Sequence, residues 1–567
     1  MYDKSGNRNA EPVALKTGRQ NQGLLLAAAA LVILPTFVMF MTRATPIQPG
    51  HIGIEISLPA SQRGGPETSI TVWVTPSLVR VGPTDAPGKA PSINLSGARG
   101  ETVDSQVVVR APVGNSLTAV NVSASTLTAP GGATIAASNI TLFREYYLNT
   151  NGTNSAGGTN PPLGSGTYAE PLIPFNDAET GRALCGSSAT LKACNATINA
   201  GRNQPYWVDF FIPRGARNSP AGTYTGTITV KSDQGSSTIP VTLTVWNFEL
   251  PLVPSEKSLF LYWTNEIDST AHQALLRNKV MPWYEPPPTV PSDMSNWGLN
   301  RSGLDRYSYI GIQCSGSYDS LPTASQISGW AASNPKGLPL DFYAADEIIG
   351  CPAAYLPLTT LANNAHRAGV KILVTIPPVS ALYGVVDHWT MLTFNWPSSL
   401  SGIPGDFWSY ASCNIGSGNT PGWMVDYPPI NERIQAGFLN QTQGASGILY
   451  WRTDNWTAGN TVGSWNNVET QGCGAGYNSP GDGIFLYPPG PIASTEPAPG
   501  IRLKAIRDGI QDYEYVQILK NLGQAAFANS VIQPIATSWT HWTHDPNALT
   551  AARMQLGQKL NQLSLHM

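Results

Sequence analysis

The hydrophobic pattern of this 567-residue chain changes once, at the proline-rich segment 250–254 (LPLVP). Before it, apolar and polar residues alternate, as in the run 70–74 (ITVWV), which is the two-residue period of half-buried strands. After it, short apolar runs alternate with helical stretches, which is typical of a β/α architecture. We therefore expect a multidomain fold, with a β-sandwich over residues 46–252 followed by a (β/α)8-like (TIM) barrel with C-terminal helices over residues 253–567.

Two runs near the end of the first domain predict a β-hairpin. TYTGTITV begins at Thr223 and IPVTLTVW at Ile239, and the linking residues SDQGSS include a glycine suited to a turn. Hairpins of this kind build antiparallel sandwiches. Further upstream, segment 149–168 (NTNGTNSAGGTNPPLGSGTY) is too polar and too rich in glycine for a core. It is expected to be a long surface loop.

The second domain contains one clear β/α unit. LDFYAADE (340–347) predicts a strand, residues 356–368 a helix that stops at Gly369, and VKILVTI (370–376) a second, buried strand. Residues from Ile501 onward predict a further helix. More barrel strands are expected in YIGIQC from Tyr309, VDHWTML from Val386, DFWSYA from Asp406, GILYW from Gly447 and GIFLYP from Gly483.

Composition excludes several classes of protein. The chain has 33 Lys and Arg against 36 Asp and Glu, so no basic excess is available to bind phosphates, and no nucleic-acid partner is expected. Charged residues make up only 12%, and 55 Gly with 47 Pro indicate many turns rather than a helical bundle. No G-x-S-x-G, P-loop or dinucleotide-binding motif occurs. We expect neither a metal nor an organic cofactor.

The N-terminus predicts export. Residues 24–42 form an uncharged, largely apolar run that follows four basic residues, Lys4, Arg8, Lys16 and Arg19. Residues 1–45 are therefore expected to be a signal peptide or a membrane anchor, with the rest of the chain outside the cytoplasm, either secreted or anchored. No second run approaches this length. Any contact with a membrane is expected only through this segment.

The six cysteines fit an oxidising compartment. Their spacing predicts a disulfide between Cys185 and Cys194. Six cysteines allow 15 pairings, so the spacing only suggests the two other neighbouring pairs, Cys314 with Cys351 and Cys413 with Cys473.

Asp346 and Glu347 are the strongest chemical candidates, because barrel enzymes keep their catalytic groups at the carboxyl ends of strands. Adjacent side chains on a strand point to opposite faces, so both acids can reach one substrate only if the chain turns there. Taken alone, two adjacent acids more often cap a helix. The Gly-Cys-Pro at 350–352 would permit such a turn.

Aromatic residues cluster near the predicted strand ends. Each one alone more often packs in a core, but Trp and Tyr faces also stack on sugar rings. Beside Asp387, His388, Arg452, Asp454 and Asn455, the set predicts a carbohydrate cleft. The aromatics are Trp263, Trp283, Tyr284, Tyr343, Trp389, Trp408, Tyr410, Tyr450, Trp451, Trp456 and Tyr487. From these groups we expect the substrate-binding residues to be Tyr410, Trp451, Trp389, Asp387 and Asn455.

Segment 481–519 resembles the C-terminal signature of glycoside hydrolase family 123 and its wider relatives. A GDG is followed by Tyr-Pro, a proline-rich gap, Ile-Arg-Leu, and the helical pattern RDGxxDYEY at 507–515. The resemblance extends through GILYWRTDNW, VDHWTML and AADE into SPAGTYTGTITV and VWNFELP, and covers most of residues 70–560. It implies a β-sandwich joined to a (β/α)8-like barrel. The charges of the helical pattern are expected to form a network within and between helices that holds the barrel.

The resemblance also implies an activity, that of exo-acting β-N-acetylgalactosaminidases. In this family an adjacent Asp-Glu pair is catalytic, which by position makes Asp346 and Glu347 the catalytic residues. The 2-acetamido oxygen of the substrate attacks C1, Glu347 acts as acid and then base, and Asp346 holds the acetamide N–H. Tyr410 is expected to donate its hydroxyl to the acetamide, and Trp451 to stack on the sugar. Ile348 stands where family members often have Pro, so the following loop is expected to differ.

Two other functions fit the same residues. A hydrolase of the same fold could cleave a sugar without an acetamido group, with Asp387 or Asp454 as nucleophile or base. A cell-surface protein could bind glycans in the aromatic cleft without turnover. In each case the expected partner is a glycan or glycoconjugate.

Overall fold

The computed structural model describes residues 70–565 except for short segments at 155–156, 187, 265–267, 284–289, 305–311, 313, 315–319, 335–336, 413–417 and 471–476. The predicted signal or anchor at 1–45 lies outside the described residues. Among the helices that are described, none combines the length and the apolar character needed to cross a bilayer.

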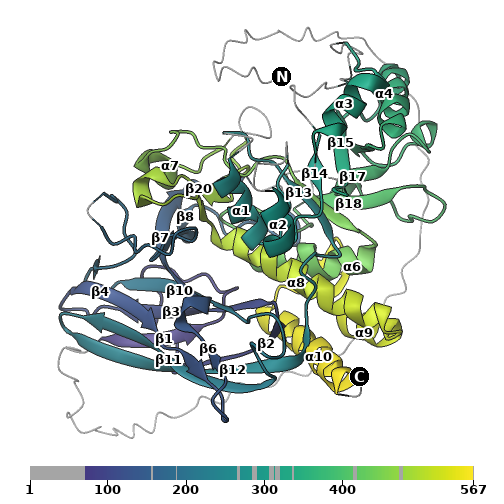
Figure 1. Cartoon of the computed structure of the whole chain (residues 1–567). Helices are drawn as coiled ribbons and strands as arrows, with labels where there is room; N and C mark the ends of the chain where they lie inside the picture. The colour runs from purple at the N-terminus through teal and green to yellow at the C-terminus, as the bar shows by residue number, and fades with distance from the viewer. Residues whose placement is uncertain are drawn as a thin grey trace, which may run out of the picture. The chain divides into compact units, whose positions relative to one another are not determined.

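The first part of the chain forms two mostly antiparallel sheets that enclose one core (Figure 1). Val107 and Tyr206 of one sheet and Val241 and Leu243 of the other are fully or almost fully buried in the same cluster. The first sheet has the order β1 (Thr71–Thr75), β3 (Thr102–Arg110), β10 (Asn203–Phe211), β7 (Ile140–Thr150), β8 (Gly166–Pro174). The second has the order β2 (Ile93–Arg99), β12 (Gly235–Glu249), β11 (Gly222–Ser232), β4 (Leu117–Ala124), β9 (Ala196–Ile198), with β5 (Leu127–Thr128) and β6 (Thr134–Ile135) at its side.

The predicted hairpin is confirmed, with a tighter turn than expected. β11 and β12 pair antiparallel from Gly222 opposite Val245 to Ser232 opposite Gly235, so only two residues form the turn. Along β12 the apolar residues Ile239, Val241, Leu243 and Val245 are buried in alternation with more exposed ones, because successive side chains of a strand face opposite sides. The polar residues assigned to the turn instead extend both strands.

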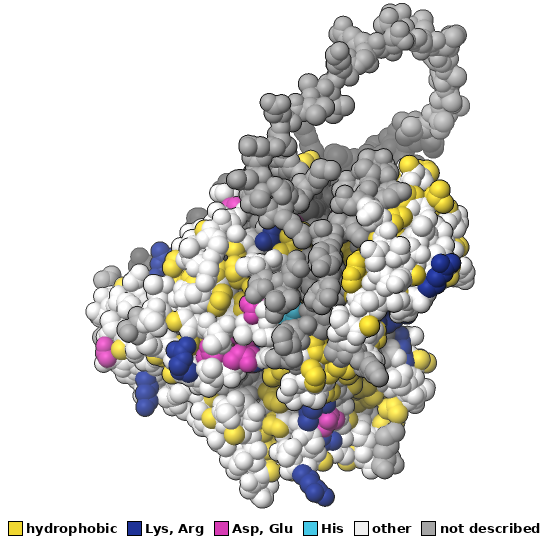
Figure 2. All heavy atoms as spheres, turned by 45° about the horizontal axis from the view of Figure 1, so that its top comes forward, with side chains coloured by type: hydrophobic (Ala, Val, Ile, Leu, Met, Phe, Trp, Pro, Cys, Tyr) yellow, Lys and Arg dark blue, Asp and Glu magenta, His cyan; other side chains and the backbone are white. Residues whose placement is uncertain are grey.

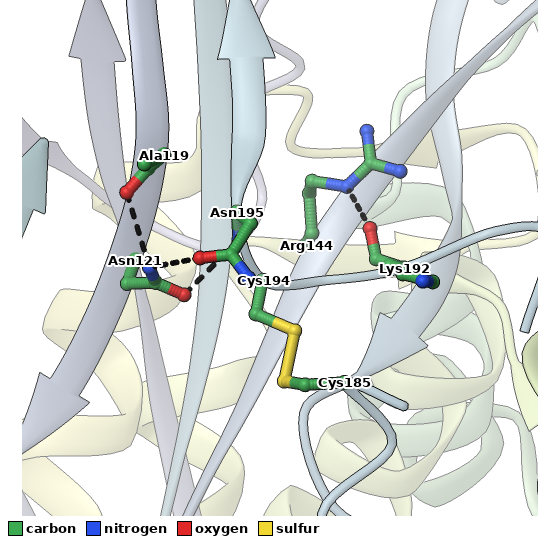
Figure 3. The surroundings of a disulfide bond; sticks show 7 residues. All are labelled: Ala119, Asn121, Arg144, Cys185, Lys192, Cys194 and Asn195. Atoms are coloured by element: carbon green, nitrogen blue, oxygen red, sulfur yellow. Dashed lines mark hydrogen bonds between the residues drawn. A yellow bond between two sulfur atoms is a disulfide. The ribbon is translucent and has the colours of Figure 1, made fainter. Parts of the chain in front are cut away.

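The predicted disulfide between Cys185 and Cys194 is confirmed (Figure 3). It lies beside Asn195, whose backbone N–H donates to the Asn121 side chain at 3.0 Å. A second disulfide joins Cys314 to Cys351, as the spacing suggested. Cys413 and Cys473 lie outside the described residues.

The second part of the chain is built on seven parallel strands that form one strongly curved, nearly closed sheet. Their order is β13 (Lys257–Phe260), β19 (Gly447–Tyr450), β18 (Asp406–Tyr410), β17 (His388–Leu392), β16 (Lys371–Thr375), β15 (Leu340–Asp346), β14 (Ser302–Gly303). On the free side of β13, Phe260 forms a parallel bridge with Pro282. Because all seven strands run the same way, their carboxyl ends lie along one rim.

The barrel departs from the regular (β/α)8 pattern in its crossovers. Helix α4 (Tyr355–Arg367) joins β15 to β16 and ends before Gly369, whose φ of +74° is the expected left-handed stop. The next two connections contain only single 3₁₀ turns, at Ser380–Leu382 and Thr393–Asn395. The other helices are α1 (Ser269–Arg277), α2 (Val290–Trp297), α3 (Ala324–Ala332), α5 (Ile430–Ile434), α6 (Asn440–Gln443), α7 (Val462–Asn466), α8 (Ile501–Asn521), α9 (Ala525–Ile532) and α10 (Pro546–Ser564).

One predicted barrel strand is wrong. In GIFLYP, only β20 (Leu486–Tyr487) is a strand, and it pairs antiparallel with β21 (Ala498–Pro499) outside the parallel sheet. Gly481 and Gly483 both have positive φ, so the chain turns sharply just before the apolar run, and two prolines end it. The run GIFLYP contains buried apolar residues, but the glycines before it and the prolines after it prevent it from forming a barrel strand.

The charged network on α8 reaches further than predicted. It was expected to hold the barrel, whereas Arg502 pairs with Glu170 at 2.8 Å, and Arg507 pairs with Asp104 at 2.5 Å and with Asp209 at 2.9 Å. These three acids belong to β8, β3 and β10. The network therefore joins the barrel to the two-sheet domain.

The glycine-rich segment 149–168 is a mostly exposed loop between β7 and β8, as predicted, but it is anchored to another loop. Thr153 donates its backbone N–H to Asp426 at 2.7 Å, and the Asn160 side chain donates to the Thr420 carbonyl at 2.8 Å. Asn160 is buried. The segment packs on the loop region that follows β18, because its small residues allow the two backbones to approach closely.

Charged groups are sparse on the face of the molecule shown in Figure 2. Uncharged polar and apolar atoms cover most of it, and the Lys and Arg side chains are scattered rather than gathered into a continuous patch. This distribution follows from the low charged fraction of the chain.

Candidate active site

Asp346 and Glu347 lie at the carboxyl end of β15, on the rim shared by all seven strands. A bulge between Tyr343 and Ala345 adds one residue to β15 relative to β16. Glu347 then turns the chain with φ of +47°. Both features break the strict alternation of a strand, so the predicted turn is present where two adjacent acids need it.

Two hydroxyl groups hold the Asp346 carboxylate. The Tyr343 hydroxyl and the Thr375 hydroxyl both donate to Asp346 Oδ1, each at 2.6 Å. Without the bulge, Tyr343 and Asp346 would point to opposite faces of β15. Thr375 ends β16 and also accepts the backbone N–H of Glu347 at 3.2 Å.

Tyr410 contacts the second acid from across the barrel. Its hydroxyl donates to Glu347 Oε1 at 3.3 Å, although β18 and β15 are separated by two strands, which shows how strongly the sheet curves. Burial and the neighbouring Asp346 carboxylate raise the pKa of Glu347, while the Tyr410 hydroxyl opposes this. Burial, followed by the nearby acids, raises the pKa of Tyr410 well above its usual range. Glu347 is therefore suited to carry a proton and Tyr410 to remain a donor.

Trp451 lies on the same rim, directly after β19. Its indole N–H donates to the buried Asp482 at 3.1 Å, and its ring meets Trp263 edge to face at a centroid distance of 5.8 Å. Both rings are half-buried. Gly483 packs against the Trp451 ring, where a Cβ atom would approach to 2.8 Å. The GDG segment thus positions an aromatic face at the rim.

Asn455 and Asp454 are held by other protein groups. Asn455 accepts from Arg452 at 3.1 Å. Asp454 is fully buried and accepts the backbone N–H groups of Trp263 and Thr264 at 3.0 and 2.5 Å. Asp454 thus holds the backbone of Trp263 and Thr264, just after β13.

The structure does not bring Asp387 and Trp389 to the acid pair. Asp387 directly precedes β17, so it lies at the amino end of the barrel, where it contacts His366 at 2.8 Å and accepts the Ile372 N–H at 2.8 Å. Trp389 is fully buried, and its indole donates to the Pro404 carbonyl at 2.8 Å. The prediction that these two residues face the substrate does not agree with this arrangement.

Thr375 and Asp482 are contacts of the site that sequence reasoning did not select. Thr375 ends VKILVTI, and its position at a strand end was the available signal. Asp482 lies in the GDG motif, which served only to identify the resemblance of segment 481–519 to the family. Burial raises the pKa of Asp482, and the Tyr450 hydroxyl donates to it at 2.7 Å.

No three His, Cys, Asp or Glu side chains of the described residues come close enough to hold a metal ion. A cavity of about 620 Å³ lies elsewhere, between the two-sheet domain and helices α8 and α10. It is lined in part by Glu101, Asp104, Asp508 and Arg553, which belong to the ion-pair network joining the domains.

Two family models match the chain. The glycoside hydrolase 123 N-terminal domain matches residues 80–232, and the glycoside hydrolase 123 catalytic domain matches residues 399–519. The second match includes Tyr410, Trp451 and most of α8 but not β15. Searching the curated proteins gave no match.

Among solved structures, a family 123 glycoside hydrolase from Clostridium perfringens, studied for glycolipid glycan hydrolysis, aligns with a TM-score of 0.61 at 14% identity. The alignment covers 88% of this chain and 99% of that one. At this identity the likeness shows a shared fold. A β-glucuronidase from Parabacteroides merdae and a putative β-galactosidase from Bacteroides fragilis align at 8% and 10% identity, over 61% and 67% of this chain and 45% and 54% of theirs. Both have TM-scores of 0.24, too low to support an inference.

Proposed function

The chain is a relative of glycoside hydrolase family 123 in both its N-terminal and its catalytic domain, and from this we propose that it is an exported glycosidase that removes terminal β-linked N-acetylgalactosamine. The observation that carries the proposal is the acid pair itself. Asp346 and Glu347 leave β15 together at the barrel rim, and the Tyr410 hydroxyl lies 3.3 Å from Glu347.

The proposed reaction uses the substrate's own acetamido group as nucleophile. Its carbonyl oxygen attacks C1 while Glu347 transfers a proton to the departing glycosidic oxygen, so the C1–O bond breaks and an oxazolinium forms. Glu347, now ionised, takes a proton from water, whose oxygen attacks C1 and reopens the ring with net retention. The raised pKa of Glu347 supports the first step, because a protonated acid is required.

The neighbouring groups have complementary roles in this proposal. Asp346 accepts the acetamide N–H and offsets the positive charge of the oxazolinium. Tyr410 turns its hydroxyl from Glu347 to the acetamide oxygen when substrate binds. Trp451, fixed by Asp482 at 3.1 Å, offers a face to the sugar ring.

The geometry argues against the rival mechanism with a second carboxylate. Asp387 lies at the opposite end of the barrel, and Asp454 is buried among backbone donors. Both carboxylates are already held by other protein groups, which favours the mechanism without a second carboxylate. An acetamido group on the substrate removes the need for either.

Export is part of the proposal. It is supported by the apolar run at 24–42 and by the disulfides Cys185–Cys194 and Cys314–Cys351, since such bonds persist in oxidising compartments.

The test is release of nitrophenol from aryl N-acetyl-β-galactosaminide by the wild-type protein and by the variants Asp346→Asn and Glu347→Gln. Both variants are expected to lower kcat by about 10²- to 10⁴-fold, because each removes a group that acts in the transition state. A thiazoline analogue of the oxazolinium is expected to inhibit the wild type.

Matched aryl galactosides, which lack the acetamido group, serve as the control substrate. Turnover of these without turnover of the N-acetyl sugar would contradict the assisted mechanism. A folded wild type inactive on both would contradict the assignment to this sugar.

A further inference from the structure

The Thr375 side chain hydrogen-bonds to both acids, to the carboxylate of Asp346 and to the backbone of Glu347. It ends β16, is only 6% exposed, and its hydroxyl lies 2.6 Å from Asp346 Oδ1 and 3.2 Å from the backbone nitrogen of Glu347. The hydroxyl has one proton and two lone pairs, so it can donate to Asp346 and accept from Glu347 at the same time.

The donors to Asp346 converge on a single oxygen. Thr375 and Tyr343 each lie 2.6 Å from Oδ1, and their hydroxyls are also within hydrogen-bond distance of each other at 3.0 Å, so the three oxygens form one cluster. These hydroxyls hold the orientation of the carboxylate, which leaves Oδ2 to accept a hydrogen bond from the N–H of a ligand.

The acceptor side of the same hydroxyl acts on Glu347. The left-handed conformation of this residue, with φ of +47°, is unfavourable for a side chain with a Cβ, and its N–H needs a partner at the strand end. Thr375 supplies that partner. The direction in which the Glu347 carboxyl leaves the rim therefore depends on the same oxygen that holds Asp346.

We propose that Thr375 is a positioning residue whose single hydroxyl couples the two acids, orienting Asp346 to accept the acetamide N–H and aiming Glu347 at the glycosidic oxygen. This inference rests on the proposed function. The titratable groups that face Asp346 among the described residues are Tyr343 on its own strand, Glu347 beside it and Tyr410 from β18.

The experiment compares Thr375→Val, Thr375→Ser and Tyr343→Phe in the full chain, on the aryl N-acetyl-β-galactosaminide. Valine keeps the shape of threonine without the hydroxyl. We expect kcat to fall about 10- to 100-fold with KM changed less than about threefold, since a hydrogen bond to a charged group is lost.

The two other variants separate the hydroxyl from mere packing. Thr375→Ser restores the hydroxyl with less bulk and should return kcat nearly to wild type. Tyr343→Phe removes the other hydroxyl beside Asp346 but leaves the contact between Thr375 and the Glu347 N–H in place, so it should cause a smaller loss of kcat. Thr390→Val on β17 is the matched control, because that hydroxyl is buried without a hydrogen-bond partner among the described residues and should leave activity unchanged.

Thermal unfolding of each variant distinguishes a local effect from misfolding. If folded Thr375→Val keeps the wild-type kcat, if folded Thr375→Ser loses about 10-fold or more in kcat, or if Tyr343→Phe leaves kcat at the wild-type value, the proposal is overturned. The last two outcomes can be read even where the valine variant does not fold. An inactive wild type would instead overturn the proposed function, and this inference with it.

Discussion

Glu347 adopts a backbone conformation that residues with a Cβ seldom use. The left-handed region costs about 1–2 kcal/mol, and here it is stabilised by the N–H contact to Thr375 and by the preceding bulge in β15. Glycine would adopt this turn more readily but could not carry an acid. The cost is therefore retained at the position where two consecutive carboxyls have to face one ligand.

Removal of the Tyr410 hydroxyl is expected to move the basic limb of the pH–rate profile upward. This hydroxyl stabilises the ionised form of Glu347, so Tyr410→Phe raises the pKa of Glu347 further and keeps the acid protonated to higher pH. We expect a shift of about half to one unit, measured on a substrate with a poor leaving group. A substrate whose leaving group needs no proton should show no such shift, and a shift to lower pH would contradict the contact.

A substitution at Asp387 tests whether this residue acts on the substrate or only on stability. Asp387→Asn is expected to leave kcat/KM within about threefold of wild type, because the residue lies at the amino end of β17 and contacts no part of the acid pair. Its loss should appear in the melting temperature instead, through His366 and the Ile372 N–H. A hundredfold fall in kcat/KM at unchanged stability would show that the residue acts on substrate.

The acid pair could be predicted from sequence, whereas its surroundings could not. A strand followed by Asp-Glu and a Gly-Cys-Pro indicates both a rim position and a turn. The bulge that turns Tyr343 toward Asp346 leaves no composition signal, since it depends on the register between β15 and β16. For Asp387 and Trp389, the predicted strand was right, but the pattern did not say which end or which face each residue occupies.

At the scale of elements, α8 and the helical segment that begins with α5 approach closely at two glycines. A Cβ on Gly509 would lie 2.5 Å from the Arg433 carbonyl, and one on Gly437 would lie 2.9 Å from the Gly509 carbonyl. The glycine of the RDG sequence at 507–509 is thus needed for the close approach of the helices, whereas the Arg and Asp supply charges. Arg433 and Asp512 pair across the same contact at 2.7 Å.

Gly509→Ala is therefore expected to destabilise the protein. The added methyl group would overlap backbone, at a cost of about 1–3 kcal/mol that exceeds the gain in helix propensity. The matched control is Gly329→Ala in α3, where a Cβ meets nothing within 4 Å, and a gain of about 0.5–1 kcal/mol is expected. Urea unfolding of both variants gives the comparison. Equal effects at the two sites would contradict the close crossing of the helices.

Elements with strong periodicity were predicted well and irregular connections were not. The hairpin of β11 and β12, helix α4 with its glycine stop, and helix α8 match the patterns. The run GIFLYP carries the same apolar signal as a barrel strand, but Gly481, Gly483 and the following prolines remove it from the parallel sheet. Local hydrophobicity does not specify the partner strand, which tertiary packing decides.

At the scale of the whole molecule, two buried acids link stability to pH. Burial raises the pKa of Glu145 and of Glu432 to about 8, and neither carboxyl has a hydrogen-bond partner among the described residues. Both lie near the Arg80, Glu170 and Arg502 cluster between the domains. In the folded protein they bind protons that the unfolded chain releases above its ordinary carboxyl pKa.

The free energy of unfolding is therefore expected to fall as pH rises from about 5 to about 8, by up to about 1.4 kcal/mol per pH unit for each of the two acids. Asp209, whose pKa is lowered to about 2, has the opposite effect on the free energy of unfolding, because its stabilising contribution is lost as the pH falls, but this happens only in strong acid. Urea titrations across this range give the slope. In the double variant Glu145→Gln, Glu432→Gln, the free energy of unfolding should depend less steeply on pH. An unchanged slope would show that other groups bind the protons.

The ion pairs that cross from α8 to the two-sheet domain have a consequence for how such a protein can diverge. Arg502 and Arg507 are buried, and their partners Glu170, Asp104 and Asp209 are supplied by the other domain. A gene rearrangement that joined this barrel to a foreign partner would bury unpaired positive charge unless the matching acids came with it. The two halves are thus expected to be inherited together, with substitutions on one side limited by what the other side carries.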